Sequence, residues 1–265
     1  MTENVTAPET AEAVVPTTAE GVKSVEEVAY FAGFDFGTLE VTLENLLKAG
    51  VHFGHLKSRR HPKMDEYIFT TRKNINILDL EKTAAKLETA SAFLTEVVKS
   101  GKPVLFVGVK KQTHDSVKSL AERIGMPYVI DRWLGGTLTN FSHIKSRAKY
   151  LVETEEKLAR GEFKKYTKFE QAKKNEEIER LEKRMGGIKT LDMIPGAIVI
   201  ADTREADIVI HEARKLSVPI VGIVDSNTDP SFVDYPIPGN DDAVSSLRMV
   251  LGALGKVVLK AKEGK

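Results

Sequence analysis

The stretch that decides the fold is LEKTAAKLETASAFLTEVVKSGKPVLFVG, residues 80–108. Its first part carries Leu80, Leu87, Leu94 and Val97 at helical spacing, and the glycine that follows is a typical helix C-cap. The apolar run PVLFV comes directly afterwards and has the length of a strand. A strand that is apolar on both faces is typical of a parallel sheet with helices on either side. The stretch therefore predicts a helix that leads into a buried, central strand.

The same alternation continues toward the C-terminus. The later segments are, in order, helix QTHDSVKSLAERIG, strand MPYVI, strand GAIVIAD, helix READIVIHEARKLS, strand VPIVGIVD and helix DDAVSSLRMVLGALGKVVLKAK. Helices and buried strands in turn predict a doubly wound, mostly parallel α/β sheet with right-handed crossovers.

Residues 144–186 interrupt this alternation. Apolar residues recur three and four positions apart in two arms, and ARGEFKKYTK lies between the arms as a turn. The positions are Ile144, Ala148, Leu151 and Leu158 in the first arm and Ile178, Leu181 and Met185 in the second. This pattern predicts a helical coiled-coil hairpin inserted into the α/β domain. Its excess of Lys and Arg hints at phosphate contact, although solvation of two exposed helices explains most of the charges.

The N-terminal region differs from the rest in composition. Residues 1–40 carry eight acidic side chains and one basic one, so the remainder has a net charge of about +8, which permits nucleic acid as a partner. The first part lacks any periodicity and reads as a disordered extension. Phe31, Phe34 and Phe36 are expected to dock on the core, with a partner as the alternative, and a short helix is predicted from Thr42 to Lys48. We divide the chain into an acidic, disordered extension (1–40), the first part of the α/β domain (41–143), the hairpin (144–186) and the second part of the domain (187–265).

The overall composition excludes several classes of protein. The chain has 265 residues, of which 42% are hydrophobic and 29% charged, as is typical of a soluble globular protein. It has neither an apolar run of membrane-spanning length nor a secretory signal, so we expect a cytoplasmic protein without a membrane partner. The absence of cysteine excludes disulfides, thiolate nucleophiles and cysteine zinc sites.

Polar residues follow the predicted strands at the sheet edge where doubly wound folds bind ligands. They are Lys110, Lys111, Asp202, Thr203, Asp225 and Asn227. Neither G-x-G-x-x-G nor G-x-x-x-x-G-K-[ST] follows the first strand, which argues against a dinucleotide or P-loop enzyme. Asp202 and Thr203 have an alternative explanation as helix N-caps. Asp225, Asp229 and Asp234 either surround a divalent cation or belong to an ordinary turn, and the sequence leaves both readings open.

The stretch HFGHLKSRRHPKM, residues 52–64, gathers histidines and cations. His52 and His55 are three residues apart, but Gly54 separates them and no third ligand follows at a zinc-motif spacing, so a metal site is the less favoured reading. An irregular loop would display together the cations Lys57, Arg59, Arg60 and Lys63, with Arg72 and Lys73 following. Such a loop suits a phosphate backbone, and a merely solvated loop is the alternative.

A second cluster lies in DRWLGGTLTNFSHIKSR, residues 131–147. Two glycines allow another molecule to approach the backbone closely, and Arg, Thr and Asn side chains can bind phosphate and sugar oxygens. Trp133 alone would be a packing residue. Because these glycines and polar side chains lie beside it, contact with structured RNA explains the cluster better than packing alone. No Ser-His-Asp arrangement or carboxylate pair points to catalysis.

At these residues the sequence resembles the universal small-subunit ribosomal protein two family in its bacterial form. The similar phrases occur in the family's order over residues 43 to about 255. They are LLKAGVHFGH with HPKM, LDLEKT, LFVGVKK, RWLGGTLTNF, LEKRMGGIK, IPGAIVIAD, EARKLSVPIVGIVDSNTDP and VDYPIPGNDDA. The acidic extension precedes the family's usual start, and RKNINILDL departs from the family's phrase near residues 74–76.

The resemblance implies a Rossmann-like, flavodoxin-type domain with a coiled-coil hairpin. It implies a structural, non-catalytic protein that binds small-subunit ribosomal RNA near the junction of head and body and joins late in assembly. Neighbouring ribosomal proteins, including the large messenger-binding ribosomal protein one, are the implied partners, without a cofactor, a metal or a small-molecule substrate. The residues that we expect to contact RNA are His52, His55, Lys57, Arg59, Arg60, Lys63, Arg72, Lys73, Lys110, Lys111, Arg132, Thr137, Thr139, Asn140, Lys145 and Arg147.

Two other functions stay open at this point. One is an α/β enzyme or sensor that binds a nucleotide or sugar phosphate at the strand ends, and such a ligand would raise the melting temperature. The other is a scaffold whose hairpin and acidic extension bind proteins, and such binding would be insensitive to salt.

Overall fold

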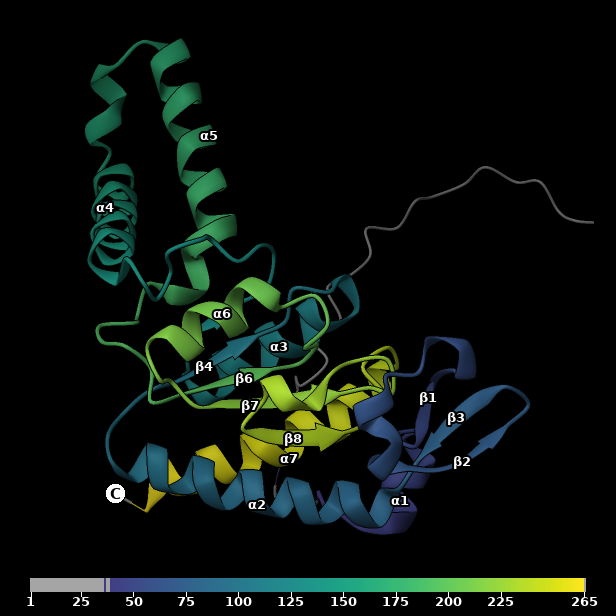
Figure 1. Ribbon diagram of the computed structural model, residues 1–265. Helices are drawn as coiled ribbons and strands as arrows, with labels where there is room; N and C mark the ends of the chain where they lie inside the picture. Colours follow the sequence, from purple (N-terminus) through teal and green to yellow (C-terminus); the bar gives the residue numbers. More distant parts are fainter. Residues whose placement is uncertain (1–35, 37–38, 265) are drawn as a thin grey trace, which may run out of the picture.

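A computed structural model describes Phe36 and residues 39–264 of the chain. Its centre is a five-stranded sheet in the order β5-β4-β6-β7-β8, and all four neighbouring pairs are parallel (Figure 1). The strands are β4 (Val104–Val107), β5 (Tyr128–Val129), β6 (Ala197–Ile200), β7 (Ile220–Val224) and β8 (Tyr235–Pro238). Counted from β4, this is the flavodoxin-like order 2-1-3-4-5. The predicted doubly wound, Rossmann-like sheet is thus confirmed.

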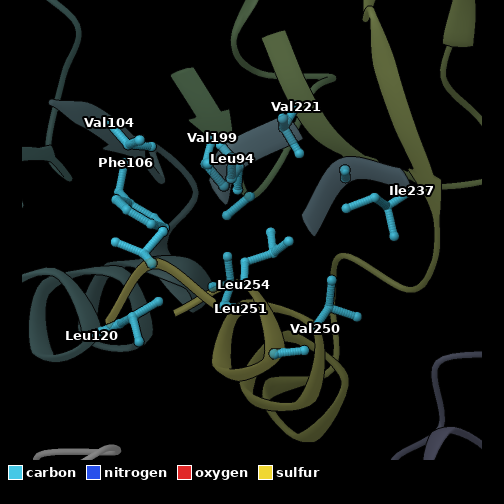
Figure 2. Close-up of a cluster of buried hydrophobic side chains, with 14 of the residues drawn as sticks. Leu94, Val104, Phe106, Leu120, Val199, Val221, Ile237, Val250, Leu251 and Leu254 are labelled. Atoms are coloured by element: carbon cyan, nitrogen blue, oxygen red, sulfur yellow. The ribbon is translucent and has the colours of Figure 1, made fainter. Parts of the chain in front are cut away.

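The apolar run that begins with β4 is buried on both faces. Val104 and Phe106 belong to one hydrophobic core, and Leu105 and Val107 belong to the core on the opposite face. The first core is closed by α2 (Leu80–Lys99), α3 (Lys111–Ile124) and α7 (Val244–Glu263), and Figure 2 shows Leu94, Leu120 and Leu254 packing under the strands. The second core is closed by α6 (Asp207–Lys215) and the segment around Trp133. Helices on both faces explain why the strands carry no polar face.

A second, antiparallel sheet of three strands precedes α2. It has the order β1-β3-β2, with β1 at Phe53–Leu56, β2 at Ile68–Arg72 and β3 at Ile75–Leu78. Lys73 and Asn74 join β2 to β3 with φ of 48° and 63°, the backbone that a two-residue type I′ hairpin turn requires. Between β1 and β2 lie the 3₁₀ helices η1 (Lys57–Arg59) and η2 (Pro62–Tyr67). From the sequence, residues 52–64 were expected to form only an irregular loop.

The segment predicted as a hairpin contains two helices joined by a short 3₁₀ turn. They are α4 (Phe141–Ala159) and α5 (Lys168–Met185), with η3 (Glu162–Lys165) between them, and the pair projects from the sheet domain (Figure 1). The residues buried along the pair are Ala148, Leu151, Thr154, Ile178, Leu181 and Met185. Leu158 is exposed, contrary to its predicted place in the seam. A coiled-coil geometry and the proposed division into parts stay predictions.

Three smaller expectations have clear outcomes. Phe36 is buried in the first core, as expected, whereas Phe31, Phe34 and almost all of the acidic extension lie outside the described residues. The short helix α1 (Leu43–Lys48) is present, with Thr42 as its N-cap. Asp202 and Thr203 do not cap α6, because this helix begins at Asp207 after Ala206.

The remaining elements are short. They are η4 (Gly186–Ile188), which leads from α5 toward β6, and η5 (Pro230–Phe232), which lies between β7 and β8. Among the described helices, none combines the length and the apolar character that a membrane crossing requires.

Candidate nucleic-acid interface

The cations of the first basic stretch lie on the small antiparallel sheet. Lys57 and Arg59 belong to η1, and Arg72 and Lys73 stand at the β2–β3 turn. The backbone N–H of Lys57 donates a hydrogen bond of 2.8 Å to the carbonyl of Asn74, which brings η1 beside this turn. All four side chains are exposed, and within the described part of the chain none of them has a carboxylate partner. This group of four is called the basic edge below.

The two other cations of this stretch are engaged with acidic neighbours. Arg60 Nε lies 2.5 Å from Asp65, and Lys63 Nζ lies 2.8 Å from Asp229. Burial alone would raise the pKa of Asp229, but its hydrogen bonds from Lys63 and Ser231 lower it to about 2. Asp229 therefore stays ionised at neutral pH, and its contact with Lys63 fixes the loop. Arg60 and Lys63 therefore have a structural role, and RNA contact by them stays a prediction.

Exposed apolar side chains accompany the basic edge. Phe69 is 74% exposed, and Phe53, Leu56 and Ile75 of the same sheet are also exposed. Exposed aromatic rings beside cations provide stacking surfaces for unpaired bases. The sequence analysis did not single out Phe69. The signal that could have found it is an aromatic residue in the short run IFTTR, which has the composition of a strand and ends at a cation.

The second cluster is built around a carboxylate that the sequence analysis missed. Glu212 of α6 is only 8% exposed, and it accepts hydrogen bonds from the loop that follows β5. Its donors are Trp133 Nε1 (3.1 Å), Gly136 N (2.7 Å), Leu138 N (3.0 Å), Thr139 N (3.1 Å) and Thr139 Oγ1 (3.2 Å). Burial alone would raise the pKa of Glu212, but these donors lower it overall. A buried carboxylate thus shapes the whole loop.

The loop residues divide into buried and exposed ones. Trp133 is buried, and so is Thr137, whose hydroxyl donates to the carbonyl of Leu134 at 2.6 Å. Gly136 has φ of 91°, which only glycine adopts readily, whereas a Cβ on the exposed Gly135 would meet nothing within 4 Å. The position of Thr137 favours a structural role over RNA contact. The exposed members are Arg132, Gly135, Thr139 and Asn140.

The start of α4 adds further cations. Lys145 pairs with Asp192 at 3.2 Å, and the Arg147 guanidinium lies 5.9 Å from the centre of the Tyr150 ring. Both belong to the helix that the Glu212-bound loop leads into. This places the loop and the base of the hairpin on one candidate surface, while the basic edge lies on another part of the molecule (Figure 1).

Lys110 and His55 each contact acidic side chains at the sheet edge instead of facing solvent, and Asp242 is a partner of both. Lys110 Nζ lies 3.1 Å from Asp241 and 2.7 Å from Asp242. His55 Nδ1 lies 2.9 Å from Asp225, and its Nε2 lies 3.3 Å from Asp242. These contacts make RNA contact by Lys110 or His55 less favourable. Lys111, by contrast, is exposed.

His52 does not join this group. Burial lowers its pKa, its Nδ1 has no hydrogen-bond partner among the described residues, and its ring lies 4.0 Å from that of Phe53. The less favoured reading of His52 and His55 as a shared metal site has no support among the described residues, since His52 belongs to no group of side chains that could share an ion. RNA contact by His52 stays a prediction.

The three aspartates considered for a cation do not converge. Asp225 follows the end of β7, but Asp234 accepts a hydrogen bond of 2.8 Å from Ile220 N at the start of the same strand. Asp229 is bound to Lys63. The reading of Asp225, Asp229 and Asp234 as one divalent cation site is therefore wrong, because Asp225 and Asp234 lie at opposite ends of β7.

Comparisons with known proteins identify the family of the chain. A sequence model of the family described as "Ribosomal protein S2" matches residues 46–261. A "Small ribosomal subunit protein uS2" from Roseiflexus castenholzii is 48% identical over 222 residues, which cover 84% of this chain and 84% of the relative. A protein of the same name from Roseiflexus sp. (strain RS-1) is 46% identical over 222 residues, covering 84% of this chain and 85% of the relative. The chain therefore belongs to the ribosomal protein S2 family.

Proposed function

We propose that this protein is a structural, non-enzymatic constituent of the small ribosomal subunit, and that it binds small-subunit ribosomal RNA through the basic edge. Its place is then the cytoplasmic ribosome. The relatives are named as small-subunit proteins. The observation that carries the RNA contact is the group of exposed cations on one small sheet, which have no carboxylate partner among the residues that the structure describes. Cations displayed in this way release counterions when they bind phosphates.

The family resemblance supports finer points of the same proposal. We place the protein near the junction of head and body and expect it to join late in assembly, with the messenger-binding ribosomal protein one as a candidate neighbour. The exposed residues of the Glu212-bound loop and the base of α4 form the second contact surface. Profiling of assembly intermediates tests the timing, because early particles should lack this chain.

The test of the RNA contact is a neutral triple variant, Arg59→Gln, Arg72→Gln and Lys73→Gln. Glutamine is polar and uncharged, and it is unbranched at Cβ like lysine, so it makes no new demand on the positive φ at Lys73. Each lost phosphate contact should reduce the salt slope of log K by about 1, so the triple change should reduce it by about 3. Binding is measured to small subunits that were stripped of this protein, at several salt concentrations, by sedimentation through sucrose.

A matched control removes three exposed cations elsewhere, through Lys99→Gln, Lys102→Gln and Lys215→Gln. It changes the net charge equally, so it separates a local contact from general attraction. If both triple variants lost affinity to the same extent, the basic edge would not be the contact surface. If the unmodified chain stayed at the top of the gradient at every salt concentration, the ribosomal assignment itself would be wrong.

A further inference from the structure

The first described residue of the chain lies in the seam between α3 and α7. Phe36 is only 5% exposed and belongs to the core that these two helices cover. A Cβ added at Gly255 of α7 would lie 3.4 Å from the Phe36 ring, and the guanidinium of Arg123 in α3 lies 4.7 Å from the centre of that ring. Because core side chains fill the inner side of the seam, the segment that precedes Phe36 must begin at its outer side.

The seam is lined by small side chains. Gly252 and Gly255 are both buried and lie one turn apart on the same face of α7. On α3, Ser119 lies one turn before Arg123 and is half-buried. A Cβ at Gly255 would come within 2.5 Å of Leu120 in α3, so the two helices pack closely there. Glycine and serine at these positions allow the backbone of a further element to approach.

One end of the seam is closed. Near the ends of both helices, Lys262 Nζ donates a hydrogen bond of 2.7 Å to the carbonyl of Ile124 and one of 3.1 Å to the carbonyl of Gly125. On the chain's other side, Lys256 Nζ donates to the carbonyl of Leu39 at 2.7 Å. An element that arrives at Phe36 through the seam therefore comes from the direction of Ser119 and the first half of α7.

The two helices present a positively charged surface. Together they carry seven lysines or arginines and three acidic residues. Arg123 lies at the Phe36 ring, Arg248 lies two turns before Gly255 on α7, and Lys256 follows Gly255 directly. Such a surface attracts a negatively charged partner.

The segment just before Phe36 has the sequence SVEEVAYFAGFD, residues 24–35. Ser24 and Glu27 have the spacing of a capping box, and Gly33 is a typical C-cap, so the sequence predicts a short helix between them. One face of this helix is apolar, with residues at the spacing i, i+3, i+4 and i+7. The residues of this face are Val25, Val28, Ala29 and Ala32.

The same segment fits the seam in charge and length. It contains Glu26, Glu27 and Asp35 and no basic residue. A helix over residues 25–32 is about 12 Å long, and the part of α7 from Arg248 to Gly255 spans about 10 Å. The segment continues directly into Phe36, so its effective concentration at the seam is high.

We propose that residues 24–35 form a helix that docks in the seam between α3 and α7, with its apolar face on the small side chains and its acidic residues toward the cations. The expected docking of Phe31 and Phe34 on the core is then docking beside this seam. The outer face of α3 and α7 is covered by the chain itself and is not a contact surface for a ribosomal partner. This inference does not rest on the RNA contact, and its test needs only the isolated protein.

The test uses the absence of cysteine from the chain. Ser119→Cys places a single thiol in the seam, and the rate of its reaction with a maleimide reports how well it is covered. In the full chain this thiol should react about tenfold more slowly than in a chain that lacks residues 2–35. The control Ser142→Cys places the thiol at an exposed position of α4, where both chains should react equally fast. Circular dichroism confirms the fold of each variant.

A second comparison keeps the full chain and decides the question if the shortened chain does not fold. Val25→Asp with Val28→Asp puts charge on the apolar face of the proposed helix, so Ser119→Cys should react about tenfold faster. The matched control makes the same change at Val14 and Val15, which lie in the part of the extension that lacks periodicity. It should leave the reaction rate unchanged.

The outcomes identify the occupant of the seam. Equal rates for Ser119→Cys in the full and the shortened chain would overturn the proposal. So would an equal acceleration by both pairs of aspartates, because the covering residues would then lie elsewhere in the extension. The rates are also measured at an about tenfold higher protein concentration, where an intramolecular helix gives the same rate. Slower reaction at the higher concentration would show that a second copy of the chain covers the seam, which would contradict the proposal as well.

Discussion

Replacing Glu212 by Gln should lower the free energy of unfolding by about 3 kcal/mol, because one carboxylate satisfies five donors of the loop after β5. An amide offers a single oxygen. If that oxygen accepts from Trp133 and Gly136, the amide NH₂ group faces the N–H groups of Leu138 and Thr139, and buried donors are left without acceptors. Unsatisfied buried donors are costly, whereas the surrounding volume hardly changes.

The measurement is thermal unfolding of the isolated protein. A loss of about 3 kcal/mol corresponds to a melting temperature lower by about 6 to 12 °C for a domain of this size. The control is Glu205→Gln, which makes the same chemical change at an exposed position just before α6. Equal melting temperatures for the two variants would show that Glu212 does not hold the loop.

The same carboxylate predicts a pH dependence. The pKa of Glu212 in the folded protein lies below its ordinary value of 4.5, since the loop donors outweigh the effect of burial. Its stabilisation is therefore fully present above the ordinary value and is lost as the pH falls through the lower, folded value. The difference in stability between the unmodified chain and Glu212→Gln should shrink as the pH falls below about 4.5.

The main sheet could be predicted because its signals are local. The run at residues 104–107 is apolar on both faces, and a glycine marks the end of the helix before it. β8 was missed, since Tyr235–Pro238 contains two prolines, which weaken any strand signal. Prolines are tolerated there because β8 is an edge strand of the sheet.

The sites were harder to predict because their partners are distant in sequence. Glu212 lies 76 residues from Gly136, and His55 lies 170 residues from Asp225. Nothing local in IHEARK distinguishes a buried carboxylate from an exposed one. Lys110 was recognised as a residue of the sheet edge, but the aspartates that engage it follow β8, the strand that was missed. The cations of the basic edge, by contrast, were predicted from a short, charged stretch.

The second large effect is expected at the base of the hairpin, where Gly187→Ala should cost about 3 kcal/mol of stability. A Cβ at Gly187 would lie 2.3 Å from the carbonyl oxygen of Tyr128 and 2.6 Å from its ring. Tyr128 belongs to β5, which is paired with β4, so this backbone cannot yield without disturbing the sheet. The segment that carries α5 must therefore move away from β5.

The neighbouring glycine supplies a matched control. A Cβ at Gly186 would approach the Glu182 carboxylate, the far end of a flexible side chain that can rotate away, so Gly186→Ala should change stability by less than about 0.5 kcal/mol. Urea unfolding compares the two variants, and binding to stripped small subunits shows whether displacement of α4 and α5 also weakens the second contact surface. If both alanines were tolerated equally, η4 would not pack against β5. If only Gly187→Ala lost stability but bound small subunits normally, the hairpin base would hold the fold together without contributing to the interface.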